Sequence, residues 1–150
     1  MTRRQLLERL DDERIRQAIA EAERRSTGEV RVSISTFFWG SVQRNAELAF
    51  ARLGLASAPE RNAVLLFLVP SRRRLVVLGD EAIHRIVGGE FWAQLSDAVL
   101  ERFRAGEFTE GLVLGIERAG EALAQHFPRT VPGPNLFPDE IDLGPRHPEA

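Results

Sequence analysis

Hydrophobic residues recur every three or four positions through the first 22 residues of the chain. This spacing places them on one side of a helix, and the acids Asp11 and Asp12 suit the first turn of a helix. The pattern predicts one opening amphipathic helix that ends near Ser26.

Shorter patterns predict three strands after this helix. Residues 30–34 alternate between apolar and polar side chains, which indicates a strand with one buried face. The continuous apolar run at residues 62–69 indicates a strand that is covered on both faces. Residues 70–74 combine a proline with three consecutive arginines and predict a turn, after which residues 75–78 return as a hairpin partner.

The remaining apolar periodicity predicts three more helices. One lies between the first two strands and stops at Gly54, one follows Gly88-Gly89, and one begins where Thr109 caps it. The last helix carries Gly111 and Gly115 four residues apart, so we expect a neighbouring element to approach its backbone closely.

This order of elements belongs to the α/β class and predicts an α/β/α sandwich, with a small mixed β-sheet flanked by helices on both faces. Six of the 8 prolines lie at or beyond Pro128, which predicts a domain at residues 1–127 and a Pro-rich acidic C-terminal tail at residues 128–150. Residues 135–142 mix apolar and acidic side chains and fit a docking motif, a segment folded back on the domain, or plain disorder.

Composition narrows the chemistry of this domain. All 20 basic side chains are arginines, and lysine, cysteine and tyrosine are absent, which excludes lysine Schiff bases, thiolate nucleophiles and disulfides. The net charge is −2, so we do not expect a nucleic-acid partner. The apolar runs are too short for a membrane span and the N-terminal pattern lacks a signal-peptide core, so we expect a soluble, cytoplasmic monomer.

A series of short motifs resembles the TPM domain family over residues 11–127. The matching segments are Gly28-Glu29-Val30-Arg31-Val32, residues 61–67, Gly79-Asp80, Phe91-Trp92, residues 103–108, Gly111-Leu112 and Gly115-Ile116. Members of the family include thylakoid-lumen and photosystem repair proteins and a nematode receptor modulator, and the resemblance implies their α/β/α sandwich fold. Some members have acid phosphatase activity or bind calcium, so the resemblance also implies calcium or magnesium as candidate cofactors.

The chain departs from the family pattern at two of these segments. Many members carry Asp-Asn-Gly where Arg61-Asn62-Ala63 stands, and Gly-Tyr-Gly-Leu-Glu where this chain has residues 79–83. Calcium needs several convergent oxygen ligands, and Arg61 replaces one of them with a guanidinium. A metal site carried over from the family would therefore be weakened here, and the chain is most similar to the soluble, stand-alone members.

Two adjacent acids provide the candidate metal site. Asp80 and Glu81 directly follow the third predicted strand, at a strand end where open α/β sheets place ligands, and their carboxylates could bind a cation or orient a water. Glu29, at the start of the first predicted strand, is the third candidate ligand. The alternatives are that Asp80 caps the following helix and that Glu29 forms a surface ion pair with Arg61.

Arg61, Asn62 and Trp39 are the candidate ligand-binding residues. Residues 72–74 could clamp a phosphate together with Arg61, or form a solvated hairpin tip that discourages edge pairing. Four aromatic residues could line a pocket or belong to the core: Phe37, Phe38, Trp39 and Trp92. The sequence contains no zinc-type histidine spacing, no serine nucleophile elbow and no phosphate loop.

These observations support a TPM-like accessory or binding module that docks a protein or a small molecule near Asp80, the loop after Ile34 and the aromatic residues. The alternative is a metal-dependent acid phosphatase-like hydrolase, in which Asp80 and Glu81 hold calcium or magnesium and an arginine stabilises the phosphoryl oxygens. A third hypothesis is a structural homodimer through exposed aromatic residues. Convergence of the Asp80, Glu81 and Glu29 carboxylates would favour the hydrolase, and their separation would favour the binding module.

Overall fold

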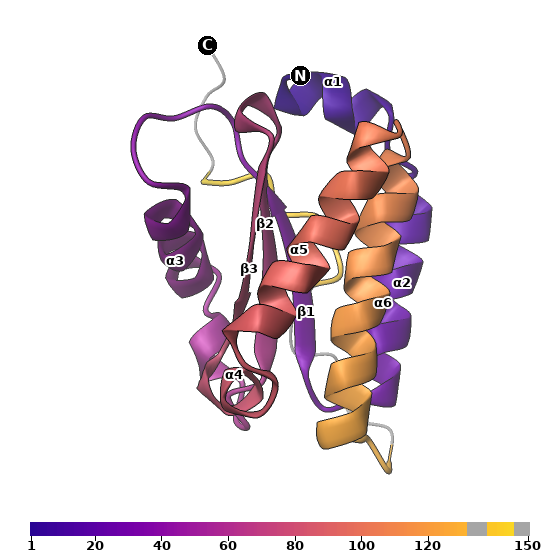
Figure 1. Cartoon of the computed structure of the whole chain (residues 1–150). Helices are drawn as coiled ribbons and strands as arrows, with labels where there is room; N and C mark the ends of the chain where they lie inside the picture. Colours follow the sequence, from indigo (N-terminus) through magenta and orange to yellow (C-terminus); the bar gives the residue numbers. More distant parts are fainter. Residues whose placement is uncertain (132–137, 146–150) are drawn as a thin grey trace.

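The centre of the molecule is a three-stranded sheet in the order β1-β2-β3. The computed structural model describes residues 1–131 and 138–145, and Figure 1 shows the sheet between layers of helices. The strands are β1 (Glu29–Ile34), β2 (Ala63–Val69) and β3 (Arg74–Gly79). β1 and β2 are parallel and β2 and β3 are antiparallel, which confirms the predicted mixed sheet.

The strand directions decide which residues meet at each end of the sheet. Glu29 lies beside Ala63, and Val64 lies beside Gly79. The starts of β1 and β2 therefore meet the end of β3. The ends of β1 and β2 lie at the opposite end of the sheet, together with the 3₁₀ turn Pro70–Arg72 that joins β2 to β3.

Helices cover both faces of this sheet, as predicted for an α/β/α sandwich. They are α1 (Arg3–Glu8), α2 (Asp12–Arg25), α3 (Val42–Arg52), α4 (Glu81–Val87), α5 (Gly89–Arg104) and α6 (Phe108–His126). In Figure 1, α2, α5 and α6 lie on one side of the sheet and α3 lies on the other. Alternate residues of β2 point to opposite faces, so Leu66 packs in the core under α5 and α6 while Leu65 packs in the smaller core under α3.

The opening helix is divided in two, contrary to the prediction of one continuous helix. Asp11 has extended backbone and caps α2, because its carboxylate accepts a hydrogen bond from the Arg14 N–H at 3.2 Å. The predicted cap of the last helix is also wrong: α6 begins at Phe108, and the Thr109 hydroxyl accepts from the Asp11 N–H at 3.0 Å. Thr109 therefore connects the starts of two helices and caps neither.

β1 is buried on both faces, whereas its alternating pattern predicted one buried face. The described part of the C-terminal segment lies along its outer edge: the Ile34 N–H donates to the Asp142 carbonyl at 2.9 Å, and the Asp142 N–H donates to the Val32 carbonyl at 2.8 Å. Arg52 Nη1 and Nη2 hold the Asp142 carboxylate at 3.2 and 2.6 Å. Residues 138–145 are thus folded back on the domain, while positions 135–137 of the predicted motif lie outside the described residues.

The contacts of Asp142 at this position lower the pKa of its carboxyl group. Burial acts to raise its pKa, but hydrogen bonds from Arg52 and Ser33 outweigh burial and lower the pKa below its ordinary value. Asp142 is therefore ionised at neutral pH and holds the C-terminal segment against α3 and β1.

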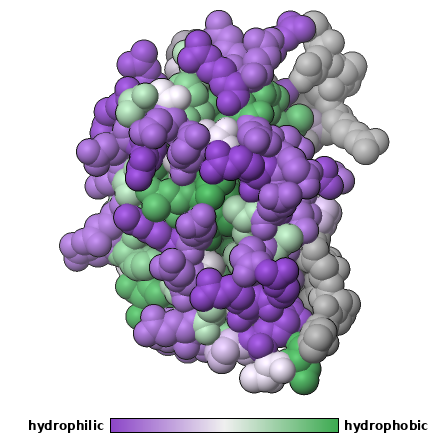
Figure 2. Space-filling view, turned by 90° about the vertical axis from the view of Figure 1, so that its right-hand side faces the viewer, coloured by the Kyte–Doolittle hydropathy of each residue, from purple (hydrophilic) through white to green (hydrophobic). Residues whose placement is uncertain are grey.

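Two glycines of α6 allow close contact with α5, as predicted. A Cβ at Gly111 would lie 2.8 Å from the Phe103 ring and 3.1 Å from the Val99 carbonyl oxygen, and a Cβ at Gly115 would lie 2.8 Å from Val99 Cγ2. Figure 2 looks onto the right-hand side of Figure 1, where α2 and α6 lie, and shows apolar side chains gathered within a mostly hydrophilic surface. Among residues 1–131 and 138–145, no helix has the length and apolarity that a membrane crossing requires.

Candidate functional site

An ion pair joins the segment before β2 to the residue after β3, and we call it the Arg61 corner. Arg61 Nε donates to Asp80 Oδ2 at 2.7 Å, and Nη2 donates to Oδ1 at 3.0 Å, the two-pronged geometry in which a guanidinium matches a carboxylate. Nη1 lies 3.5 Å from Glu81 Oε1. The Asp80 side chain is 9% exposed and the Arg61 side chain 42%, so the acid is buried beneath its partner.

The backbone around the Arg61 corner fixes this geometry. The Asp80 N–H donates to the Ala63 carbonyl at 2.9 Å, and the Ala82 N–H donates to the Arg61 carbonyl at 3.1 Å. Asp80 is also the cap of α4, because its Oδ1 accepts from the Glu81 N–H at 2.8 Å. The capping alternative is therefore present, and the hydrogen bond with Asp80 raises the pKa of Arg61 above its ordinary value.

The structure brings Asp80 and Glu81 together but places Glu29 elsewhere. Glu29 is on β1, with β2 between it and β3, and two strand spacings amount to about 10 Å. The Arg61 guanidinium faces both acids of the corner, and both Asp80 oxygens already accept N–H groups. These residues do not fit calcium or magnesium, which need convergent oxygen ligands, and no group of three acids or histidines within residues 1–131 and 138–145 could hold a metal ion.

Glu29 meets Glu23, not Arg61. The two side chains hydrogen-bond to each other, and they belong to residues that are only 3% and 7% exposed. Burial, the hydrogen bonds with Asp139 and Glu29, and the charges of these two carboxylates together raise the pKa of Glu23 to about 11, with burial as the largest cause. Burial likewise raises the pKa of Glu29, against the lowering effects of the Glu23 hydrogen bond and the charge of Arg129. This carboxyl pair therefore holds a proton at neutral pH.

The retained proton also explains the hydrogen bonding of the pair. Glu23 Oε2 accepts from the Val30 N–H at 3.2 Å, but Glu23 Oε1 and Glu29 Oε2 are buried with no donor among the described residues. Two ionised carboxylates have no donor to offer each other, and one shared proton supplies it. Glu23 was not among the predicted site residues, although it comes four residues after Ile19 and so lies on the buried stripe of α2.

The other predicted ligand-binding residues do not join Arg61. Asn62 is 1% exposed, and its Nδ2 donates to Thr27 Oγ1 at 3.1 Å, so it lies inside the domain. Trp39 is 88% exposed in the loop after β1, at the opposite end of the sheet. Trp92 is buried, and its Nε1 donates to His84 Nδ1 at 3.0 Å. The predicted aromatic residues are thus spread over both ends of the sheet and do not form one pocket.

The arginines of the hairpin turn are also remote from Arg61. Arg72 Nη1 donates to the Gly40 carbonyl at 2.6 Å, and its guanidinium lies 5.6 Å from the centre of the Phe38 ring. Seven residues of β2 separate the turn from Arg61, a length of about 20 Å. The predicted phosphate clamp of residues 72–74 with Arg61 therefore does not form.

Comparison with known proteins agrees with this architecture. The chain matches the model of the TPM domain family over residues 1–122 and belongs to that family. Its structure is similar to the NMR structure of BA42 from the psychrophilic bacterium Bizionia argentinensis, with 32% sequence identity and a TM-score of 0.81 over 89% of this chain and 92% of that one. Among curated proteins, none has a sequence detectably similar to this chain.

We expect Arg61→Ala to lower the free energy of unfolding by about 1 to 2 kcal/mol, because it leaves a largely buried carboxylate without its guanidinium. This loss of stability is smaller than for a fully buried ion pair, because the Arg61 side chain is 42% exposed and water reaches it. Asp80→Asn keeps a capping side chain but removes the charge. Urea denaturation of the two single variants and the double variant measures the coupling, which we expect to be about 1 kcal/mol. Additive effects would show that the pair contributes nothing.

Proposed function

We propose that this TPM domain is a non-catalytic binding module and not a metal-dependent hydrolase. The observation that carries the proposal is the Arg61 corner, where the guanidinium bonds both oxygens of Asp80 and approaches Glu81. A hydrolase with calcium or magnesium needs carboxylate oxygens that converge on the ion, and Asp80 offers its oxygens to N–H donors instead. The separation of Glu29 from the Arg61 corner also supports the binding module.

Turnover of phosphoesters tests this proposal most directly. Purified protein is assayed with p-nitrophenyl phosphate from pH 4 to 8, with and without added calcium or magnesium. We expect any turnover to be the same in the wild-type protein and in Asp80→Asn, because the Arg61 corner lacks an open metal site. Turnover that requires both a divalent ion and Asp80 would establish the hydrolase instead. Glu60→Gln, an exposed substitution outside the ion pair, serves as the matched control.

Metal binding is tested separately by amide chemical shifts. Calcium and magnesium are titrated into ¹⁵N-labelled protein while residues 79–83 are followed. We expect no saturable shift there, because Arg61 already neutralises Asp80. A saturable shift confined to these residues would return Asp80 and Glu81 to the role of metal ligands.

The proposal extends to partners and location. The balanced charge of the chain supports a protein or small-molecule partner, not nucleic acid. We also propose that the protein is a cytoplasmic monomer. Light scattering at high protein concentration tests the monomer, and a dimer that Trp39→Ala dissociates would support the homodimer hypothesis, because Trp39 is 88% exposed.

A further inference from the structure

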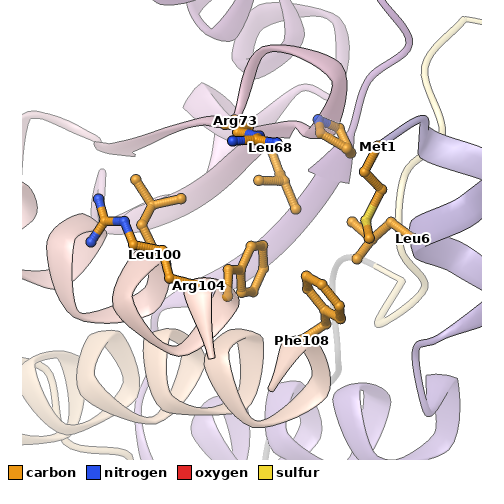
Figure 3. Close-up of a pocket in the computed structure, with 9 residues that line it drawn as sticks. Met1, Leu6, Leu68, Arg73, Leu100, Arg104 and Phe108 are labelled. Atoms are coloured by element: carbon orange, nitrogen blue, oxygen red, sulfur yellow. The ribbon is translucent and has the colours of Figure 1, made fainter. Parts of the chain in front are cut away.

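An apolar pocket of about 520 Å³ lies at the end of the sheet opposite the Arg61 corner. Its walls come from the N-terminal residue, α1, the end of β2, the following turn, the last two turns of α5 and the first residue of α6. The lining residues are Met1, Leu6, Leu68, Pro70, Arg73, Leu100, Phe103, Arg104 and Phe108. Figure 3 shows Met1, Leu6 and Phe108 on one side of the pocket and Leu68 and Leu100 on the other. A volume of this size is within the range of small-molecule sites, about 300 to 1,000 Å³.

The pocket has the position that ligands favour in open α/β sheets. β1 and β2 are parallel and both end on this side of the sheet, and ligands bind at the carboxyl ends of parallel strands. Leu68 is the second-last residue of β2, and Pro70 directly follows the strand. Asp80 follows the antiparallel β3, so the same rule does not apply to the Arg61 corner.

Two arginines from different elements supply the only charged side chains among the residues that line this pocket. Arg73 and Arg104 are exposed, and neither side chain has a hydrogen bond or ion pair with any residue in 1–131 or 138–145. Within residues 1–131 and 138–145, Arg73 is one of two non-glycine residues with a positive φ, 50°, and it ends the 3₁₀ turn before β3 begins. No acid lines the pocket, and the nearby Glu107 pairs with Arg102 at 3.5 Å.

We propose that this pocket binds an amphiphilic carboxylate, a molecule with an aliphatic body and a single carboxylate at one end. The leucine, phenylalanine and methionine side chains remove the apolar body from water. Arg73 and Arg104 hydrogen-bond the carboxylate at the rim, where a guanidinium matches two carboxylate oxygens. Two exposed arginines suit one small anion, whereas a phosphate group would call for further donors, which the apolar lining does not provide.

This inference names the ligand class of the binding module and rests on that proposed function. The two can nevertheless fail separately, because they concern opposite ends of the sheet. Turnover at Asp80 would remove the non-catalytic role and leave the pocket result standing. Failure to bind a carboxylate would remove this pocket and leave the result at Asp80 standing.

Titration of the ¹⁵N-labelled full chain with sodium decanoate, below its micelle concentration, tests the proposal. We expect saturable amide shifts in residues 68–73 and 100–108. Affinity should rise about tenfold for each two methylenes from hexanoate to octanoate to decanoate, as the burial of CH₂ groups predicts. Decyltrimethylammonium should bind at least about tenfold more weakly than decanoate, because it carries the opposite charge.

Substitutions of the rim arginines separate this site from general hydrophobic adsorption. Arg73→Gln and Arg104→Gln should each weaken decanoate binding about fivefold, which is the effect of losing one charge-assisted hydrogen bond at an exposed rim. Arg85→Gln is the matched control, because Arg85 is exposed on α4 at the other end of the sheet, and it should leave the affinity unchanged. Leu100→Trp fills the pocket and should abolish binding, and the exposed arginine variants keep the test valid if that variant does not fold.

Several results would overturn the proposal. One is equal affinity for decanoate and decyltrimethylammonium. Others are the absence of saturable shifts, shifts that spread over the whole chain, and decanoate affinity unchanged by Arg73→Gln and Arg104→Gln. Tighter binding of decyl phosphate than of decanoate would overturn the carboxylate assignment.

Discussion

Glu23→Gln is expected to raise the free energy of unfolding at pH 7 by roughly 2 kcal/mol and to flatten its dependence on pH. Burial, together with the nearby carboxyl groups of Asp139 and Glu29, raises the pKa of Glu23 from 4.5 to about 11, so the folded protein keeps a proton that the unfolded chain releases. Stability from this group is fully present below pH 4.5 and is lost as the pH rises toward the folded pKa, by about 1.4 kcal/mol per unit. Glutamine is neutral throughout and can still accept from the Val30 N–H.

Urea denaturation at pH 5, 7 and 9 measures this effect. The wild-type protein should become less stable across the series, and Glu23→Gln should remove most of that slope. Glu13→Gln, on the exposed face of the same helix, should leave the slope unchanged. The series does not go below pH 5 because Asp142, with its lowered pKa, contributes stability that is lost only as the pH falls through its folded pKa. An unchanged slope in Glu23→Gln would show that Glu23 is ionised in the folded state.

Gly79→Ala is expected to lower the free energy of unfolding by about 3 kcal/mol through overpacking. A Cβ at Gly79 would lie 2.3 Å from Trp92 Cζ2 and 3.1 Å from Ile83 Cγ2. The indole has little room to move, because Trp92 is buried and its Nε1 bonds to His84. Thermal and urea denaturation both report this loss.

Gly89→Ala is the matched control for that substitution. Its Cβ would meet no atom closer than 3.9 Å, and Gly89 begins α5, where alanine is the better helix former. We expect a gain of up to about 1 kcal/mol. If the two alanine substitutions had the same effect, the close contact between Gly79 and Trp92 would have no energetic significance.

Local patterns predicted the elements of this fold well. The apolar run of β2 and the hairpin after Pro70 depend on residues near each other in sequence, and the structure confirms both. The break at Asp11 was missed because helical spacing continues across it, while its capping side chain and the hydroxyl of Thr109 together favour a new helix start. The burial of the polar side chains of β1 was missed because the C-terminal segment, more than 100 residues away, lies along this strand, where Ser33 Oγ donates to Asp142 Oδ2 and Arg31 Nε donates to the Glu140 carbonyl.

The candidate site was predicted less well, because the rule that places ligands at strand ends holds for parallel strands. Asp80 does follow a strand, but β3 is antiparallel, so its end meets the starts of β1 and β2. The pairing of Arg61 with Asp80 and that of Glu23 with Glu29 depend on side chains from separate elements, which spacing along the chain does not reveal. The pocket near Arg73 combines five elements and has no motif of its own.

The guanidinium of Arg61 keeps its charge at every pH that a cell meets. It is part of the chain, and two hydrogen bonds hold it beside Asp80. Unlike a bound metal ion, this side chain cannot dissociate from the protein, and a chelator cannot remove it. We therefore expect the order of the loop before β2 and of the start of α4 to be independent of the supply of free divalent ions. Dialysis against EDTA should leave this part of the fold, and its melting temperature, as they were.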